Sequence, residues 1–291
     1  MVVHDLTYRR GVARAARGPR WLPIASECFS YALRNRWMKL LFALCWLPPL
    51  GAVFTLYFVR QVLAGVGAQV SAGMLSFDLD KYEIFYSSAW IPLVLLAAGA
   101  GAGLISADLR AHALELVFSR AVTRADYLLG KILGMVGVLL AATALPWTLV
   151  WLFDIGLSES SDRFFATWHY PLRLIANAVV FAVPTTLIVL AISALSGRGI
   201  WAILYWIALA IITRPVGVVA ANSLFRDTRA GVLSFIDTFN SLRFAIFDIP
   251  RNPLASMVAP PTEVAAWAVL LASALALRTL IRRTNPTEVV A

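Results

Sequence analysis

The chain has 291 residues, of which 60% are hydrophobic and only 14% are charged, and its mean hydropathy is +0.77. Soluble domains carry about 25% charged residues, so this composition excludes an ordinary soluble fold. Apolar runs of about 18 residues or more recur along the chain, and runs of that length cross a bilayer as helices. Because these runs lack the alternation of a membrane barrel, the sequence predicts an all-α, polytopic membrane protein.

The net charge is +9, which in a soluble protein would favour nucleic-acid binding. Here the basic residues lie between apolar runs, as they do in the cytoplasmic loops of membrane proteins. No RNA- or DNA-binding motif occurs, so we expect no nucleic-acid partner. The two cysteines, Cys28 and Cys45, and the three histidines have no metal-ligand spacing, and we therefore expect no metal site and no cofactor.

Six membrane-spanning helices are predicted. They cover about Leu40–Phe58, Trp90–Ser106, Ile132–Phe153, Leu174–Leu195, Ile200–Ala220 and Val264–Leu280. Lysine and arginine concentrate in residues 1–39, residues 107–131, the turn at 196–199 and the C-terminal tail. Since cytoplasmic loops are rich in these residues, we expect both termini in the cytoplasm and the chain in the inner membrane of a bacterium, surrounded by lipid.

A cytoplasmic N-terminal region, residues 1–39, precedes the membrane domain, residues 40–291. Apolar residues in this region recur at helical spacing, at Ala25, Cys28, Phe29, Ala32 and Leu33. Pro23 suits the first turn of such a helix. A basic amphipathic helix just before a span is expected to lie along the cytoplasmic membrane surface.

The connection between the fifth and sixth spans, residues 221–262, carries a second amphipathic pattern. Its apolar residues share one helical face, formed by Val232, Phe235, Ile236, Phe239, Leu242 and Ile246. Its polar residues fall mostly elsewhere, at Ser234, Asp237, Asn240 and Arg243. This pattern predicts an amphipathic or re-entrant helix at the outer surface. The alternative is an ordinary packed loop.

The connection between the second and third spans is the most informative segment. Leu114, Val117, Phe118 and Ala121 share a helical face, which predicts a short amphipathic helix. A break and a second helix start follow. Thr123 is suited to cap this second helix, with Asp126 as an acidic partner in its first turn.

This connection resembles the cytoplasmic segment that follows the second span in the ABC-2 family of transporter permeases. That segment begins with an acid, runs through Gly-Thr-Leu and Pro-Val-Ser-Arg, and closes in Leu-Gly-Lys. The residues here that match it are Asp108, Leu114, Glu115, Ser119, Val122, Thr123, Arg124, Leu129, Gly130 and Lys131. His112 and Ala113 stand in place of Gly-Thr, and Ala121 stands where the family often has proline.

The resemblance implies that residues 107–121 form a coupling helix, which docks into a separate ABC ATPase subunit. It also implies a second permease subunit, expected to be an identical copy, with ATP and Mg²⁺ bound by the ATPase alone. The residues expected to mediate coupling are Asp108, Leu114, Glu115, Val117, Phe118, Arg120 and Arg124. An apolar face with charged flanks suits a groove with a polar rim, whereas periodicity alone fits a helix on lipid equally well.

Gly99, Gly101 and Gly103 in the second span form a small-residue pattern. No strand precedes them, so they are not a dinucleotide-binding loop. Small residues let helix backbones approach closely, and we expect these glycines to serve helix packing. The resemblance adds a second expectation, that this span borders the translocation path.

The chain lacks a Walker A motif, because Leu129, Gly130 and Lys131 have neither the upstream glycine nor the following serine or threonine. The span interiors hold few ionisable residues, which argues against a membrane enzyme or a proton-coupled carrier. The sequence therefore favours a non-catalytic permease subunit of an ABC exporter. The alternative is an ATPase-coupled subunit that transmits movement to a periplasmic partner without passing a solute.

Overall fold

A computed structural model of the chain describes residues 19–63, 77–114, 122–158, 162–250 and 258–284. Over these residues the fold is helical and contains no strand. Its elements are α1 (Trp21–Ala32), α2 (Arg36–Tyr57), η1 (Phe58–Leu63), α4 (Leu79–Ser88), α5 (Trp90–Gly101), α6 (Ser106–Arg110), α8 (Arg124–Gly156), α9 (Asp162–Thr167), α10 (Tyr170–Leu195), α11 (Gly199–Ile207), η2 (Ala208–Ile212), α12 (Thr213–Val219), η3 (Ala220–Leu224), η4 (Thr228–Leu233), α13 (Phe235–Phe247) and α15 (Thr262–Arg283).

Among the described residues, six helical stretches are long and apolar enough to cross a membrane. They are Arg36–Gln61, Trp90–Arg110, Arg124–Gly156, Asp162–Leu195, Gly199–Leu224 and Thr262–Arg283. Each contains or overlaps one of the six predicted spans, which confirms the prediction of an α-helical multi-pass membrane protein. The third stretch starts well before its apolar run, because a capping residue rather than hydrophobicity sets the beginning of α8.

Three of the spans form the interior of the molecule. In the second and fourth spans 67% of the most apolar window is buried, and in the third 50%, against 22%, 22% and 17% in the first, fifth and sixth. Leu96 of α5, Leu139 of α8 and Leu190 of α10 are fully buried in the main apolar core. The outer helices instead expose large apolar side chains, such as Leu47 and Leu271, as helices in contact with lipid do.

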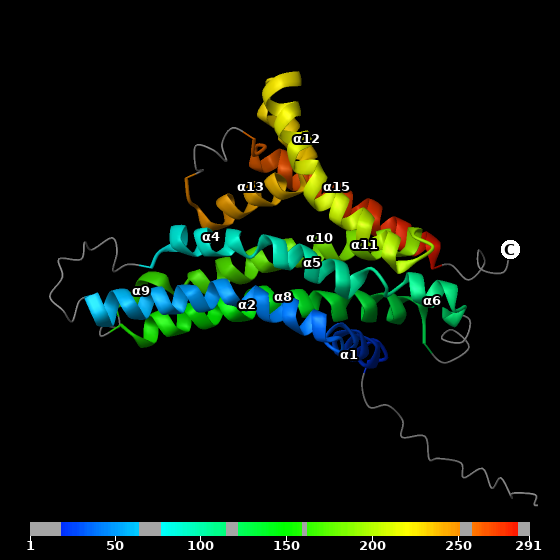
Figure 1. The fold of residues 1–291 in the computed structure, drawn as a ribbon, viewed down its shortest axis with the longest axis horizontal. Coiled ribbons are helices and arrows are strands. Elements are labelled where there is room, and N and C mark those ends of the chain that lie inside the picture. Colours follow the sequence, from blue (N-terminus) through cyan, green and yellow to red (C-terminus); the bar gives the residue numbers. More distant parts are fainter. Residues whose placement is uncertain (1–18, 64–76, 115–121, 159–161, 251–257, 285–291) are drawn as a thin grey trace, which may run out of the picture.

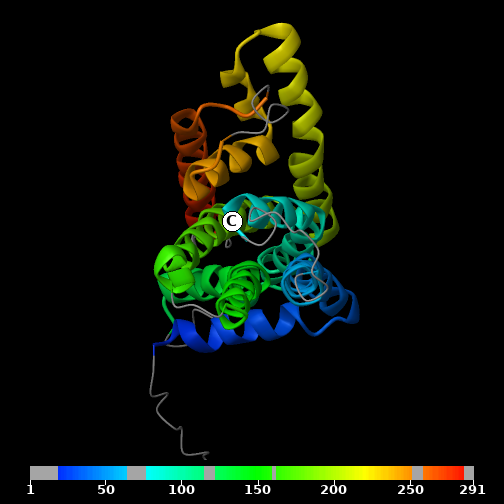
Figure 2. The same cartoon turned by 90° about the vertical axis from the view of Figure 1, so that its left-hand side faces the viewer.

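The helices fall into two groups of different direction. Helices α2, α5, α8 and α10 run along the long axis of the molecule, and α12 and α15 are inclined to them (Figure 1). Viewed along the first group, α12 and α15 stand on either side with α13 between them (Figure 2). Helices α1 and α6 and the last turns of α15 lie toward one end, called here the α1 end, and η1, α4 and α9 lie toward the other, called the α9 end (Figure 1).

Two glycines of α8 allow α1 to pack closely against it. A Cβ added at Gly134 would lie 2.7 Å from the backbone oxygen of Ala25 and 2.6 Å from Cβ of Cys28. A Cβ at Gly130 would lie 2.6 Å from Cβ of Ile24. Only glycine permits this approach of the two helices. The structure thus has the expected N-terminal helix, and its buried residues, which include Ala25 and Cys28, pack against α8.

The close approach at Gly134 predicts a difference between two neighbouring substitutions. Gly134→Ala and Gly137→Ala both gain helix propensity of about 1 kcal/mol. A Cβ at Gly137 would lie at an ordinary 3.6 Å from the Phe29 ring, whereas the Gly134 Cβ overlaps backbone atoms of α1. We therefore expect Gly137→Ala to raise the thermal unfolding midpoint of the purified protein and Gly134→Ala to lower it. Equal midpoints for the two variants would contradict this packing.

Helix α13 lies in the connection between the fifth and sixth spans, where an amphipathic helix was predicted, but its polar residues do not face solvent. Asp237, Ser241 and Arg243 are buried together with Phe239. Ser241 Oγ donates to the backbone oxygen of Pro260 at 2.7 Å, and Arg243 pairs with a carboxylate of α4. Tertiary partners thus satisfy these polar groups inside the fold.

Candidate functional site

The second span is interrupted near the α1 end. Helix α5 ends at Gly101 and α6 begins at Ser106, with turns over residues 102–105. An interruption frees backbone N–H and C=O groups, which must find partners where a bilayer supplies no water. The hydroxyl of Ser193 in α10 provides them, because it donates to the oxygen of Ala102 at 2.7 Å and accepts from the N–H of Ile105 at 3.2 Å and of Ser106 at 3.1 Å.

Sequence reasoning missed Ser193. Its side chain is completely buried, and all three of its bonds reach residues nearly 90 positions away in the chain. A single serine in an apolar helix carries no periodic signal. The only local hint of the break was the run of glycines in the second span. The structure shows that the direction of α6 is set by a contact with the fourth span.

Asp108 of α6 bonds to two residues of α8. Its Oδ2 lies 2.8 Å from Nζ of Lys131 and accepts a hydrogen bond from the hydroxyl of Tyr127 at 2.7 Å. Lys131 also donates to the backbone oxygen of Leu104 at 3.2 Å. The side chains of Asp108 and Lys131 are only 28% and 12% exposed. Hydrogen bonds between charged side chains that are largely buried are among the stronger tertiary contacts, so these bonds hold α6 against the start of α8.

The beginning of α8 is fixed locally and by one distant residue. The Thr123 hydroxyl accepts from the N–H of Asp126 at 3.2 Å, and the N–H of Thr123 donates to the Asp126 carboxylate at 3.1 Å. This is the capping box, in which Asp126 plays the acidic role that the sequence predicted. Arg124, in the first turn, donates through Nε to the hydroxyl of Thr284 at 3.3 Å. It thereby joins α8 to the end of α15.

Of the other expected coupling residues, only Leu114 lies in the part of the chain that the structure describes. Glu115, Val117, Phe118 and Arg120 lie outside the described residues. We expected Leu114 on an exposed docking face, but it is only 2% exposed and belongs to the main apolar core. The turn before it passes through the left-handed backbone region, with a φ of 50° at His112. Leu114 therefore holds the segment to the core and is not free to contact a partner.

The three glycines of the second span have different surroundings. A Cβ at Gly99 would overlap Sδ of Met38, and one at Gly101 would lie 2.6 Å from Cε of Met135. A Cβ at Gly103 would have no atom within 4 Å. Gly99 and Gly101 thus lie at close helix contacts. Gly103 borders a small cavity between α1, α6 and α8.

This cavity has a volume of about 160 Å³. It is lined by Glu27, Cys28, Tyr31, Gly103, Leu104, Ala107, Asp108 and Lys131. Burial raises the pKa of the Cys28 thiol, with Lys131 opposing that rise. The thiol is therefore neutral and a weak nucleophile near neutral pH. Among the described residues no group of three His, Cys, Asp or Glu side chains is placed to hold a metal ion.

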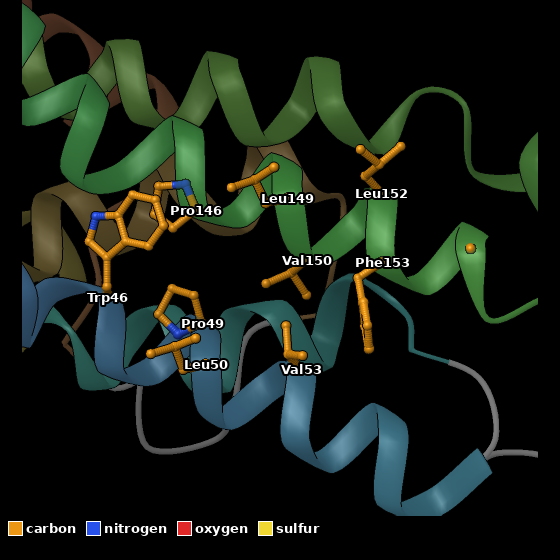
Figure 3. A pocket seen from close by; sticks show the side chains of 10 residues that line it. Trp46, Pro49, Leu50, Val53, Pro146, Leu149, Val150, Leu152 and Phe153 are labelled. Atoms are coloured by element: carbon orange, nitrogen blue, oxygen red, sulfur yellow. The ribbon is translucent and has the colours of Figure 1, made fainter. Parts of the chain in front are cut away.

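A larger cleft of about 480 Å³ lies between α2 and α8 (Figure 3). It is lined by Trp46, Pro49, Leu50, Val53, Pro146, Leu149, Val150, Leu152, Phe153 and Gly156. Pro49 and Pro146 lie inside their helices, where proline removes a backbone hydrogen bond and kinks the axis. The cleft contains no ionisable side chain, so it offers apolar contact and no reaction chemistry.

A buried charge cluster lies at the α9 end. The side chain of Asp154, at the end of α8, is fully buried; its Oδ1 is 2.7 Å from Arg60 and its Oδ2 is 3.0 Å from Arg163. Arg163 also reaches Oδ1 of Asp78 at 3.4 Å and donates to the backbone oxygen of Phe77 at 2.8 Å. The sequence analysis indicated none of these partners. The cluster joins η1, α8, α9 and the residues before α4.

The fold and these contacts define a multi-pass α-helical membrane protein with an interrupted second span. In comparisons with known proteins, the chain matches no protein-family model and no curated protein sequence significantly.

Proposed function

We propose that this chain is the transmembrane subunit of an ABC exporter of the ABC-2 type, working with a separate ATPase subunit. The observation that supports the proposal most is the contact of Asp108 with Lys131 and Tyr127. Asp108 and Lys131 stand at the first and last positions of the motif that resembles the ABC-2 segment. A motif whose two ends bond to each other forms a closed structural unit, as a coupling segment requires.

The surroundings of this contact support a mechanical role. A force applied to the connection between α6 and α8 reaches three places, because α6 is bonded to α8, the break before it is bonded to α10, and α1 packs against α8. Helix α8 has 33 residues and extends from this end of the molecule toward the other. Movement of a separate motor protein at residues 107–121 would therefore tilt the central spans rather than bend a loose loop.

Export is favoured over transmission to a periplasmic partner. Transmission to a periplasmic partner needs a free docking surface in the connection between the fifth and sixth spans. The charged and apolar residues of α13, including Asp237 and Phe239, are largely buried within the fold. The apolar cleft between α2 and α8 and the nearly uncharged core suit an apolar or amphipathic cargo better than a charged one.

A photo-crosslinking amino acid placed at Phe118 tests the partner. In intact cells we expect an adduct with a protein that carries a Walker A motif, identified by mass spectrometry. The same crosslinker at Phe165 of α9, a phenylalanine that is 71% exposed, serves as the control and should not capture that protein. Capture of the ATPase equally from both positions, or from neither, would overturn the proposal.

Substitution of Lys131 tests the transmission itself. In the complex with its ATPase, Lys131→Met removes the ammonium group that holds Asp108, so we expect ATP hydrolysis to continue while transport falls at least tenfold. Lys39→Met is the matched control, because Lys39 is an exposed lysine close to the same end. The measurement compares ATPase rate and transport rate in proteoliposomes. A parallel loss of both rates would indicate a folding defect, and unchanged transport would count against coupling through α6.

A further inference from the structure

A second, polar cavity lies between α4, α12 and α13, away from the α6 contacts. Its volume is about 320 Å³, within the range of about 300–1,000 Å³ that small-molecule sites occupy. It is lined by Glu83, Ile84, Ser87, Arg214, Val218, Asp237, Asn240, Arg243, Phe244 and Val258. Charged side chains thus share its wall with apolar ones, and the cavity is suited to a ligand with both kinds of surface.

One arginine of the cavity is already paired. Nη2 of Arg243 lies 2.8 Å from Glu83 Oε1, and the Arg243 and Glu83 side chains are 6% and 17% exposed. The guanidinium also lies over the ring of Tyr86, with 5.5 Å between Cζ and the ring centroid. Nε of Arg243 is buried and has no hydrogen-bond partner among the described residues. A buried donor without an acceptor is costly, so an acceptor that reached this N–H would stabilise the site.

The other arginine of the cavity is not closely paired. The side chain of Arg214 is 59% exposed, and its nearest carboxylate oxygen, Asp237 Oδ2, is 4.0 Å from Nε. That oxygen already accepts from Ser234 Oγ at 2.5 Å at the start of α13, and the Asp237 side chain is only 8% exposed. Arg214 is therefore the most accessible charge in the cavity. The carboxylates of Glu83 and Asp237 also line the cavity but are only 17% and 8% exposed, so Arg214 is the charged group that an incoming ligand meets first.

Arg214 lies within a membrane-spanning segment, Gly199–Leu224. An ionisable residue at such a position is costly, and it is usually retained for a function. Guanidinium groups bind carboxylate and phosphate oxygens in a two-point geometry. The apolar wall beside Arg214, formed by Ile84, Val218 and Phe244, offers contact for an alkyl chain.

We propose that this cavity binds an amphipathic anion, a carboxylate or phosphate head group on an alkyl chain. Arg214 holds the head group, and the amide of Asn240 donates to one of its remaining oxygens. The first methylenes of the chain lie against Val218 and Phe244. This binding is a property of the chain alone and does not depend on an ATPase.

Direct binding to the purified chain in detergent tests the site. The probes are oleate for the carboxylate, dioleoyl phosphatidic acid for the phosphate, and dioleoylglycerol as the uncharged control. We expect at least one anionic probe to raise the thermal unfolding midpoint in a concentration-dependent way, and dioleoylglycerol to do so no more than detergent. A response to phosphatidic acid alone assigns the site to a lipid phosphate, and a response to oleate alone assigns it to a carboxylate.

Two arginine variants make the test specific. Arg214→Gln should weaken binding of the active probe at least tenfold and leave the midpoint without probe unchanged, because its side chain is largely exposed. Arg229→Gln is the matched control, since Arg229 is a 74% exposed arginine in η4 that does not line the cavity. If Arg214→Gln lowers the unfolding midpoint without probe, Arg214→Lys is used in its place. Lysine keeps the charge but lacks the two-point geometry of the guanidinium, so this variant should also weaken binding of the probe. No response to either anion, or equal weakening by Arg229→Gln, would overturn the proposal.

Discussion

Replacing Asp154 with alanine is expected to lower the free energy of unfolding by about 3–5 kcal/mol, the range found when one partner of a buried ion pair is removed. Asp154 is fully buried between Arg60 and Arg163, which are 14% and 18% exposed. Its loss removes the carboxylate that lies between the two guanidinium groups, and Asp78, 3.4 Å from Arg163, is then the remaining carboxylate partner of Arg163 in the described cluster. The backbone oxygens of Asp154 and Phe77 continue to accept from these arginines, but they carry no full charge.

The effect is measured as the shift of the unfolding transition in mixed detergent micelles. Asp162→Ala is the control, because Asp162 is an exposed carboxylate in the first turn of α9, and it should cost less than about 1 kcal/mol. Adding Arg60→Met to Asp154→Ala should restore part of the loss, since it removes one of the two like charges that Asp154 had neutralised. An Asp154→Ala protein as stable as Asp162→Ala would show that the cluster does not hold the α9 end together.

Replacing Ser193 with alanine is expected to lower the free energy of unfolding by about 2–4 kcal/mol, since each buried group left without a partner costs about 1–3 kcal/mol. The hydroxyl bonds to the oxygen of Ala102 and to the N–H groups of Ile105 and Ser106. The Ala102 oxygen also accepts from the Ser106 hydroxyl at 3.1 Å, so it keeps one partner in the variant. The substitution removes the side-chain acceptor of the two N–H groups at the interruption between α5 and α6. We also expect α6 to become mobile relative to α10.

Ser196→Ala is the matched control for this experiment. Ser196 is also nearly buried, but its hydroxyl only donates to the backbone oxygen of Ile192, four residues earlier in the same helix. Its removal should change stability by less than about 1 kcal/mol. Amide hydrogen exchange at Ile105 and Ser106 should rise in Ser193→Ala and stay unchanged in Ser196→Ala. Equal protection of these amides in both variants would show that another contact fixes the break.

Local patterns were sufficient for much of the fold. The six spans follow from the length of the apolar runs, because a bilayer requires about 20 residues of helix whatever lies beside it. The start of α8 follows from Thr123 and Asp126, which are three residues apart. The periodicity of residues 25–33 likewise predicted the helix α1, although its close approach to Gly130 and Gly134 is visible only in the structure.

The candidate site was predicted only in part, and Leu114 shows why. Its helical periodicity with Val117 and Phe118 predicts an apolar face, but periodicity does not say which surface covers that face. In the structure Leu114 is buried in the apolar core. The contact that the structure shows between the two ends of the motif is the ion pair of Asp108 with Lys131. The partners of the polar residues of α13 are likewise not indicated by periodicity, since Arg243 pairs with Glu83 at a sequence separation of 160 residues.

The sequence by itself determined the number of spans, their all-helical nature and the capped start of α8, because those features depend on interactions within a few residues or with the bilayer. Only the tertiary structure decided which polar groups meet. Ser193 at the break in the second span, Asp108 with Lys131, and Asp154 between two arginines are partners distant in sequence or without periodic signal. A buried polar group needs a hydrogen-bond or ion-pair partner, but this requirement does not specify which residue provides it. The packing of the helices determines which residues lie close enough to do so.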